Sequence, residues 1–271
     1  MRKLNLWIIP AVFFALCCVL NLTGCAWSET LERIIKPTLM PLLSLATFTY
    51  LLEAAGRRPW ALESRSATPP TAWVPPSSGA EGGTSPAFRG AGLLMLGQMF
   101  GFAGDTMLLG KGFPFFAGGI GLFLIGHTCY ICLFGGRSWK GLKAWHWAVA
   151  MVICCALAAC LIGAIGINGA MLIPMAMYGF VLTLLMFSTL AGALRFGGLT
   201  WWMLFAGAVL FTFSDALIAV HNFHPLSPFM RGPVVMATYL AAQTLLAVGG
   251  VRLLLSTRPS GKPQDQESRG N

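Results

Sequence analysis

Two aspartates are the residues whose type and position point most directly to chemistry. Asp105 and Asp215 lie well inside apolar stretches, whereas the other seven acidic residues lie in polar segments or near the ends of apolar stretches. A carboxylate in mid-bilayer costs about 2.5–3.5 kcal/mol even on the lenient insertion scale, so such residues are functional candidates. One carboxyl acting as an acid and one as a base is the arrangement that hydrolysis with proton transfer needs. The alternative is that each aspartate only bonds neighbouring helices.

Other polar side chains lie at a similar depth in the apolar stretches and extend the candidate site. Tyr239 and Gln243 are four residues apart, so they share one face of a helix. No HExxH pattern occurs in the sequence, and neither a metal nor another cofactor is expected. With Asp105 and Asp215 as the candidate catalytic pair, the candidate substrate-binding residues are His127, Tyr178, Ser214, Tyr239, Gln243 and Lys36.

The composition places all these residues in a membrane. Hydrophobic residues make up 56% of the 271 residues and charged residues only 10%, against about 25% in an average soluble domain. The mean hydropathy is +0.72. These values exclude a soluble enzyme and a DNA-binding domain. The net charge of +9 is spread over short gaps between apolar runs, as in the cytoplasmic loops of membrane proteins, so no nucleic-acid partner is expected.

A spanning helix needs about 20 apolar residues, and eight stretches qualify. The sequence therefore predicts an all-α membrane protein with eight transmembrane helices, at roughly 4–23, 37–55, 89–110, 114–134, 146–166, 170–192, 199–220 and 233–255. Small residues such as Gly92, Gly97, Gly101, Gly118, Gly119 and Gly126 predict close packing of the third and fourth spans. With eight spans, fourteen Lys and Arg fall on one side and four on the other, which predicts that both termini are cytoplasmic.

The domain organisation follows from the same pattern. Residues 1–255 form one transmembrane domain, interrupted by a flexible Pro/Ser/Gly-rich cytoplasmic loop at 56–88, and 256–271 form a polar, disordered tail. The expected location is the bacterial cytoplasmic (inner) membrane. Leu22-Thr-Gly-Cys25 also matches a bacterial lipoprotein signal, in which the first span would be removed. Against this interpretation, the motif is short and the rest of the chain is polytopic, so we expect the first span to remain.

Short motifs surround the polar residues of the candidate site: Gly104-Asp105, His127-x-x-Tyr130, Ser214-Asp215, Thr238-Tyr239-x-x-Ala242-Gln243, Lys36-Pro37 and Tyr178-Gly179. They resemble the motifs of the YhhN family of membrane proteins, the lysoplasmalogenases, and the resemblance covers most of residues 30–255. Two departures from the family pattern are a longer loop at 56–88 and Leu240 where a second Tyr is common. Neither departure touches the aspartate pair.

The resemblance implies eight helices, a lysophospholipid substrate and membrane lipid as partners, and hydrolysis of the vinyl ether bond of lysoplasmalogens. The products would be a fatty aldehyde and glycerophosphoethanolamine or glycerophosphocholine. The two aspartates suit this reaction, because one carboxyl can protonate the β-carbon while the other stabilises the cation and deprotonates water, as the two carboxylates of a glycosidase do. Which aspartate is the acid stays open.

Three other interpretations use the same residues. A proton-coupled membrane transporter would use Asp105 and Asp215 as a proton relay. An intramembrane aspartyl protease would also use two aspartates, but the Pro-Ala-Leu motif of those enzymes is absent from the sequence. A scaffold would use them only to hold helices together. For a hydrolase, we expect an amphipathic cavity that opens on the non-cytoplasmic side, where the phosphate candidates are Lys36, His221, His224 and Arg231.

Overall fold

The computed structural model describes residues 5–27, 29–56, 86–167 and 169–256, and these residues form helices joined by short turns. The all-helical fold class predicted from the sequence is confirmed for the described residues, which contain no strand. The elements are α1 (Ile8–Trp27), α2 (Glu29–Gly56), α4 (Pro86–Met107), α5 (Phe113–Ser138), α6 (Ala144–Ile165), η1 (Gly169–Met171), α7 (Leu172–Phe196), α8 (Gly198–Phe223), η2 (Met230–Val234) and α9 (Val235–Ser256).

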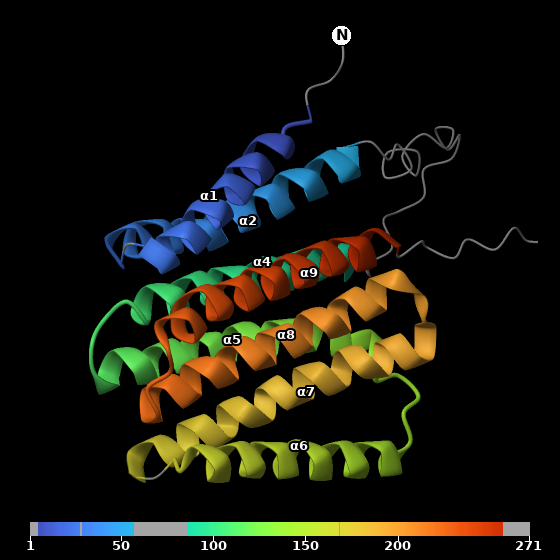
Figure 1. The fold of residues 1–271 in the computed structure, drawn as a ribbon. Coiled ribbons are helices and arrows are strands. Elements are labelled where there is room, and N and C mark those ends of the chain that lie inside the picture. The colour runs from blue at the N-terminus through green and yellow to red at the C-terminus, as the bar shows by residue number, and fades with distance from the viewer. Residues whose placement is uncertain (1–4, 28, 57–85, 168, 257–271) are drawn as a thin grey trace, which may run out of the picture.

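The helices run back and forth along one common direction (Figure 1). The helices α1 and α2 form an antiparallel pair at one side of the bundle, and α2 packs on α4. In the centre, α4 packs on α5 and α9, while α8 packs on α7 and α9. The helix α6 lies at the opposite edge, where it contacts α7 and, to a smaller extent, α8. The four helices α4, α5, α8 and α9 therefore form the centre that positions the candidate site.

Several of these helices have the length and apolarity of membrane spans. Six described segments meet that criterion: 34–54, 113–138, 144–165, 169–196, 198–223 and 230–256. They indicate an integral membrane protein. The helix α4 is not one of the six, and it carries Gln98 and Asp105 among its apolar residues. The apolar stretch of α1, Ile8–Gly24, is shorter than that criterion requires.

Glycines let α4 and α5 approach closely, as the sequence predicts for the third and fourth spans. A Cβ atom on Gly126 would lie 3.0 Å from the carbonyl oxygen of Gly97, so the two backbones nearly touch. The ring of Tyr130 covers Gly97 in the same way, since a Cβ atom there would lie 2.4 Å from the ring. The prediction does not hold for every glycine. A Cβ atom on Gly92 would have nothing within 4 Å, and a Cβ atom on Gly101 would face Gln243 and Tyr239 of α9.

The helix ends differ from those predicted. The helix α2 begins at Glu29 rather than at 37, because it continues through Pro37, a residue that membrane helices tolerate. The helix α4 ends at Met107 rather than at 110, so Asp105 lies two residues from its end. It also begins at Pro86, inside the loop predicted at 56–88; residues 57–85 of that loop, and the predicted tail from 257 onward, lie outside the described residues.

Candidate active site

Asp105 and Asp215 are brought together in the interior of the bundle. Asp105 comes from the end of α4 and is 3% exposed, whereas Asp215 comes from α8 and is 7% exposed. Tyr239, which hydrogen-bonds to Asp105, packs against Phe211, and Tyr178, which hydrogen-bonds to Asp215, packs against His127. The rings of His127 and Phe211 are themselves in contact, with their centres 4.4 Å apart. The two aspartates that the sequence singles out therefore belong to one site rather than to two separate polar contacts.

Each carboxyl group accepts a hydrogen bond from a tyrosine on another helix. The hydroxyl of Tyr239, on α9, donates to Oδ2 of Asp105 at 2.6 Å. The hydroxyl of Tyr178, on α7, donates to Oδ2 of Asp215. Both tyrosines are buried, and each bond holds its carboxyl in one orientation.

A chain of buried hydrogen bonds continues from Tyr239 into the bundle. The amide nitrogen of Gln243 donates to the hydroxyl of Tyr239 at 3.4 Å, and its amide oxygen accepts from the hydroxyl of Tyr130 at 3.1 Å. Tyr130 belongs to α5, Gln243 and Tyr239 to α9, and Asp105 to α4. Because three helices contribute, the position of the Asp105 carboxyl depends on how α4, α5 and α9 are packed together.

Aromatic rings surround this polar group. Phe211 is fully buried, and its ring centre lies 4.4 Å from that of His127 and 5.4 Å from that of Tyr239. Phe123 contacts Tyr239 edge-on at 6.3 Å. Nδ1 of His127 bonds to the carbonyl oxygen of Phe123 at 2.6 Å, while its Nε2 is buried without a hydrogen-bond partner. The carboxyl pair therefore lies in apolar surroundings, where electrostatic interactions are stronger than in water.

Two adjoining cavities lie next to Asp215. The larger has a volume of about 620 Å³ and lies where α4 and α8 end and where α5 and α9 begin. The smaller, of about 20 Å³, is lined by Tyr178 and Asp215. Leu108, Phe116 and Ile218 line both cavities and separate them. Asp215 thus faces open space, whereas Asp105 lines neither cavity.

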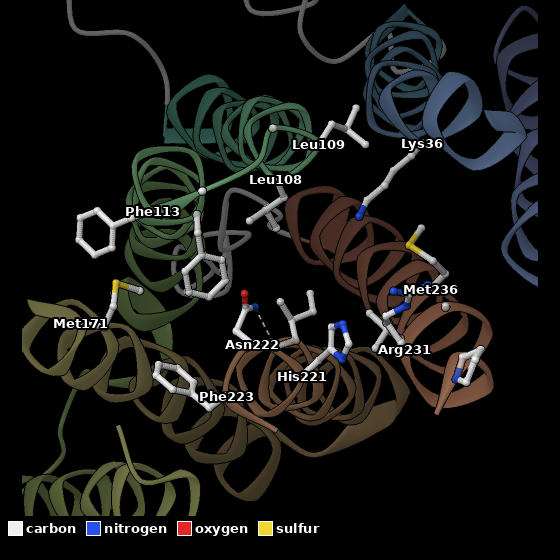
Figure 2. Close-up of a pocket in the computed structure, with 17 residues that line it drawn as sticks. Lys36, Leu108, Leu109, Phe113, Met171, His221, Asn222, Phe223, Arg231 and Met236 are labelled. Atoms are coloured by element: carbon white, nitrogen blue, oxygen red, sulfur yellow. Dashed lines mark hydrogen bonds between the residues drawn. The ribbon is translucent and has the colours of Figure 1, made fainter. Parts of the chain in front are cut away.

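The larger cavity has walls of different character (Figure 2). Lys36, His221 and Arg231 lie on one side of it, and Phe113 and Met171 lie on the other. Of the four phosphate candidates in the sequence, three line this cavity. The fourth, His224, does not: its Nε2 bonds to the carbonyl oxygen of Ile165 at 2.9 Å.

Other predicted site residues lie behind the cavities. The hydroxyl of Ser214 is fully buried and donates to the carbonyl oxygen of Val235 at 3.1 Å, which ties α8 to the start of α9. His127, Tyr239 and Gln243 also line neither cavity. His127 contacts Tyr178 and Tyr239 contacts Phe123, which both line the smaller cavity, whereas Gln243 bonds to Tyr130 and Tyr239. Two residues of this cluster, Tyr130 and Phe211, were not among the site residues predicted from the sequence. The His127-x-x-Tyr130 spacing was a signal that could have identified Tyr130. Nothing in the sequence distinguishes Phe211 from the other 18 phenylalanines.

Comparison with known proteins shows the family of the chain. The YhhN family model matches residues 31–250, a range that contains both aspartates and both tyrosines. The chain belongs to the YhhN family. Its membership confirms the resemblance that the short motifs indicate.

Several curated relatives in this family carry the name lysoplasmalogenase. Lysoplasmalogenase TMEM86A of Bos taurus is 30% identical over 162 residues, which is 58% of this chain and 65% of that protein. The Homo sapiens protein of the same name is 29% identical over 163 residues, again 58% and 65% of the two chains. Lysoplasmalogenase TMEM86B of Mus musculus is 43% identical over 82 residues, 30% of this chain and 32% of that protein. The chain thus matches slightly less than two thirds of the length of the two TMEM86A proteins and about one third of the length of the TMEM86B protein. No solved structure matches it.

Proposed function

We propose that this protein is a membrane hydrolase that cleaves the vinyl ether bond of lysoplasmalogens. The names of the curated relatives support the substrate class. The observation that carries the proposal is the placement of Asp215, which lines a small cavity next to a large amphipathic one, while Asp105, a second buried carboxyl, belongs to the same cluster of buried side chains. An amphipathic cavity with a few convergent polar groups is the usual form of a small-molecule site.

The proposed reaction divides the work between the two carboxyl groups. Asp215, in its protonated form, donates its proton to the β-carbon of the vinyl ether, which gives an oxocarbenium ion. Asp105, as a carboxylate, stabilises that cation through space. Water then adds at the α-carbon and gives its proton to the Asp215 carboxylate. The resulting hemiacetal collapses to a fatty aldehyde and a glycerophosphodiester. The roles resemble those of the two carboxylates in glycoside hydrolysis.

The neighbouring residues hold this pair in place. Tyr178 and Tyr239 orient the carboxyls through their hydrogen bonds, and Gln243 orients Tyr239. His127 packs against Phe211 and Tyr178 and shapes the apolar surroundings. Of the predicted substrate-binding residues, Tyr178 and Lys36 line a cavity, so we assign direct contact with the substrate to these two.

We also propose that all eight helices cross the membrane, with both termini in the cytoplasm and the cavity on the other side. The described cations support this orientation. At the end of the bundle away from the cavity lie Arg89, Arg137, Lys140, Lys143, Arg195 and Arg252, against Lys36, Lys111 and Arg231 at the cavity end. Lys and Arg are enriched in cytoplasmic loops.

The test is aldehyde release by the purified protein in detergent. A lysoplasmalogen is the substrate, and the matching lysophospholipid with a saturated ether is the control, because without the double bond there is no β-carbon to protonate. We expect aldehyde from the first and none from the second. Absence of aldehyde from both would contradict the proposal. If the protein, reconstituted in vesicles, instead moved protons across the membrane, the transporter interpretation would replace it.

A further inference from the structure

Two cations and one histidine of the larger cavity lie on one wall, although they come from distant parts of the sequence. Lys36 is in α2, His221 is near the end of α8, and Arg231 is in η2. In Figure 2 these three side chains lie on the same side of the cavity. No carboxylate is among the described residues that line the cavity. This wall, Lys36–His221–Arg231, is here called the cationic wall.

The backbone fixes which nitrogen of His221 can donate to a ligand. Nδ1 of His221 accepts a hydrogen bond from the backbone N–H of Leu226 at 3.1 Å. A ring nitrogen that accepts carries no proton, so the proton of the neutral ring is on Nε2. The Nε2–H group is therefore a donor whether the ring is neutral or charged. The cationic wall therefore has two charged hydrogen-bond donors, Lys36 and Arg231. Its third donor is the Nε2–H group of His221, whose ring is held in place by the bond from Leu226.

A π-helical turn carries Arg231 into this wall. The turn η2 spans Met230–Val234, and both Arg231 and Gly232 line the cavity. Such turns are rare and occur frequently at functional sites. The hydroxyl of Ser214 accounts for part of this geometry, because it bonds to the carbonyl oxygen of Val235 directly after the turn. Ser214, predicted from the sequence to bind substrate, would on this basis position Arg231 indirectly.

We infer that the cationic wall binds the phosphate group of a single-chain phospholipid, with the hydrocarbon chain along the apolar wall of Phe113 and Met171. Arg is well suited to phosphate because its guanidinium donates two parallel hydrogen bonds, and Lys adds a compact charge. The identity of the lipid rests on the proposed function, whereas the recognition of phosphate rests on the cationic wall alone.

A binding experiment without turnover tests the inference. The probes are a saturated ether lysophospholipid and the matching ether glycerol, which lacks the phosphate. The purified proteins are wild type, Lys36→Gln, Arg231→Gln and Lys111→Gln. Lys111 is the matched control, because it is exposed and lies between Gly110 and Gly112, which line the cavity, but does not line it itself. Thermal unfolding in detergent shows that each variant is folded.

We expect wild type and Lys111→Gln to bind the phosphate-bearing lipid at least tenfold more tightly than the ether glycerol, since a hydrogen bond to a charged group contributes about 1.5–3 kcal/mol. In Lys36→Gln and Arg231→Gln that preference should fall about tenfold, with ether glycerol binding unchanged. An undiminished preference in both variants, or no preference in wild type, overturns the inference.

Two further measurements separate the inference from neighbouring hypotheses. Inorganic phosphate that bound as tightly as the lipid would overturn the assignment to a lipid headgroup. If wild type released no aldehyde but kept the phosphate preference, the proposed hydrolysis would fail while the phosphate site remained. If aldehyde were released equally well from an alkenyl glycerol and from a lysoplasmalogen, the hydrolysis would hold while the phosphate site failed.

Discussion

Asp215 and Asp105 differ in what they can touch. Asp215 faces the smaller cavity, whereas Asp105 is covered and contacts Tyr239. If Asp215 transfers the proton, Asp215→Asn should lower kcat by about 10²–10⁴-fold, since one general acid or base typically contributes that much. If Asp105 stabilises the cation, Asp105→Asn should lower kcat by about 10²–10³-fold, as the loss of one electrostatic stabiliser typically does. Aldehyde release per folded molecule is the measurement.

The controls for this pair come from neighbouring residues. Thr106→Ala and Thr212→Ala remove hydroxyls that bond only within their own helices, to the carbonyls of Phe102 and Ala208. Both should keep wild-type turnover. Near-normal turnover in either Asp→Asn variant would remove that aspartate from the mechanism.

The tyrosines are expected to act through the carboxyls that they hold. Tyr178→Phe deletes the hydrogen bond to Asp215, and Tyr239→Phe deletes both the bond to Asp105 and the one that Tyr239 accepts from Gln243. A bond to a charged group contributes about 1.5–3 kcal/mol. We therefore expect kcat to fall roughly tenfold to hundredfold in both variants. KM should stay nearly unchanged in Tyr239→Phe, because Tyr239 lines neither cavity. Tyr50→Phe is the control, because Tyr50 packs edge-on against Trp7, away from the site. A purely structural role for the tyrosines would leave kcat per folded molecule as in wild type.

Sequence reasoning identified the residues of the site better than their functions. An aspartate isolated in an apolar run is visible in a sequence because its cost in a membrane demands a reason. The shared face of Tyr239 and Gln243 was also visible, because helical periodicity fixes it. Partners on other helices, such as Tyr130 for Gln243, depend on tertiary packing, which a single sequence does not encode locally.

At the level of the elements, the contact between α4 and α5 positions half of the site. Gly126→Ala would place a Cβ atom 3.0 Å from the carbonyl oxygen of Gly97 and 3.3 Å from Cβ of Phe100. Overpacking of this kind typically costs about 1–3 kcal/mol. We expect a lower midpoint of thermal unfolding in detergent and, because the helices carry Asp105 and Phe123, lower turnover.

The matched control lies on the same helix. Gly121 has nothing within 4 Å of its Cβ position, so Gly121→Ala should leave activity unchanged and stability unchanged or raised, because Ala is favoured over Gly within a helix by about 1 kcal/mol. Equal effects of the two substitutions would show that helix propensity, not close packing, explains the result.

The sequence predicted this packing from the small residues, but the predicted helix ends were wrong by several residues. Polar residues such as Glu29 and Lys36 can extend a helix past its apolar run.

At the level of the whole molecule, the distribution of cations predicts which end faces the cytoplasm. Lys111→Cys lies at the cavity end and Lys140→Cys at the other end. We expect a membrane-impermeant maleimide to label Lys111→Cys in intact cells and Lys140→Cys only after lysis, with unsubstituted protein as the background control. The opposite labelling pattern would invert the proposed orientation.

The position of the larger cavity at the end of the bundle has a consequence for what leaves it. The proposed reaction splits an amphiphile into an aldehyde that dissolves in the bilayer and a phosphodiester that dissolves in water. A cavity in the centre of the membrane would trap the phosphodiester. A cavity fully in water would trap the aldehyde. The cavity lies where α4 and α8 end. In the proposed arrangement of the helices across the membrane, this end meets the boundary between the two phases, so each product would partition directly into the phase that dissolves it.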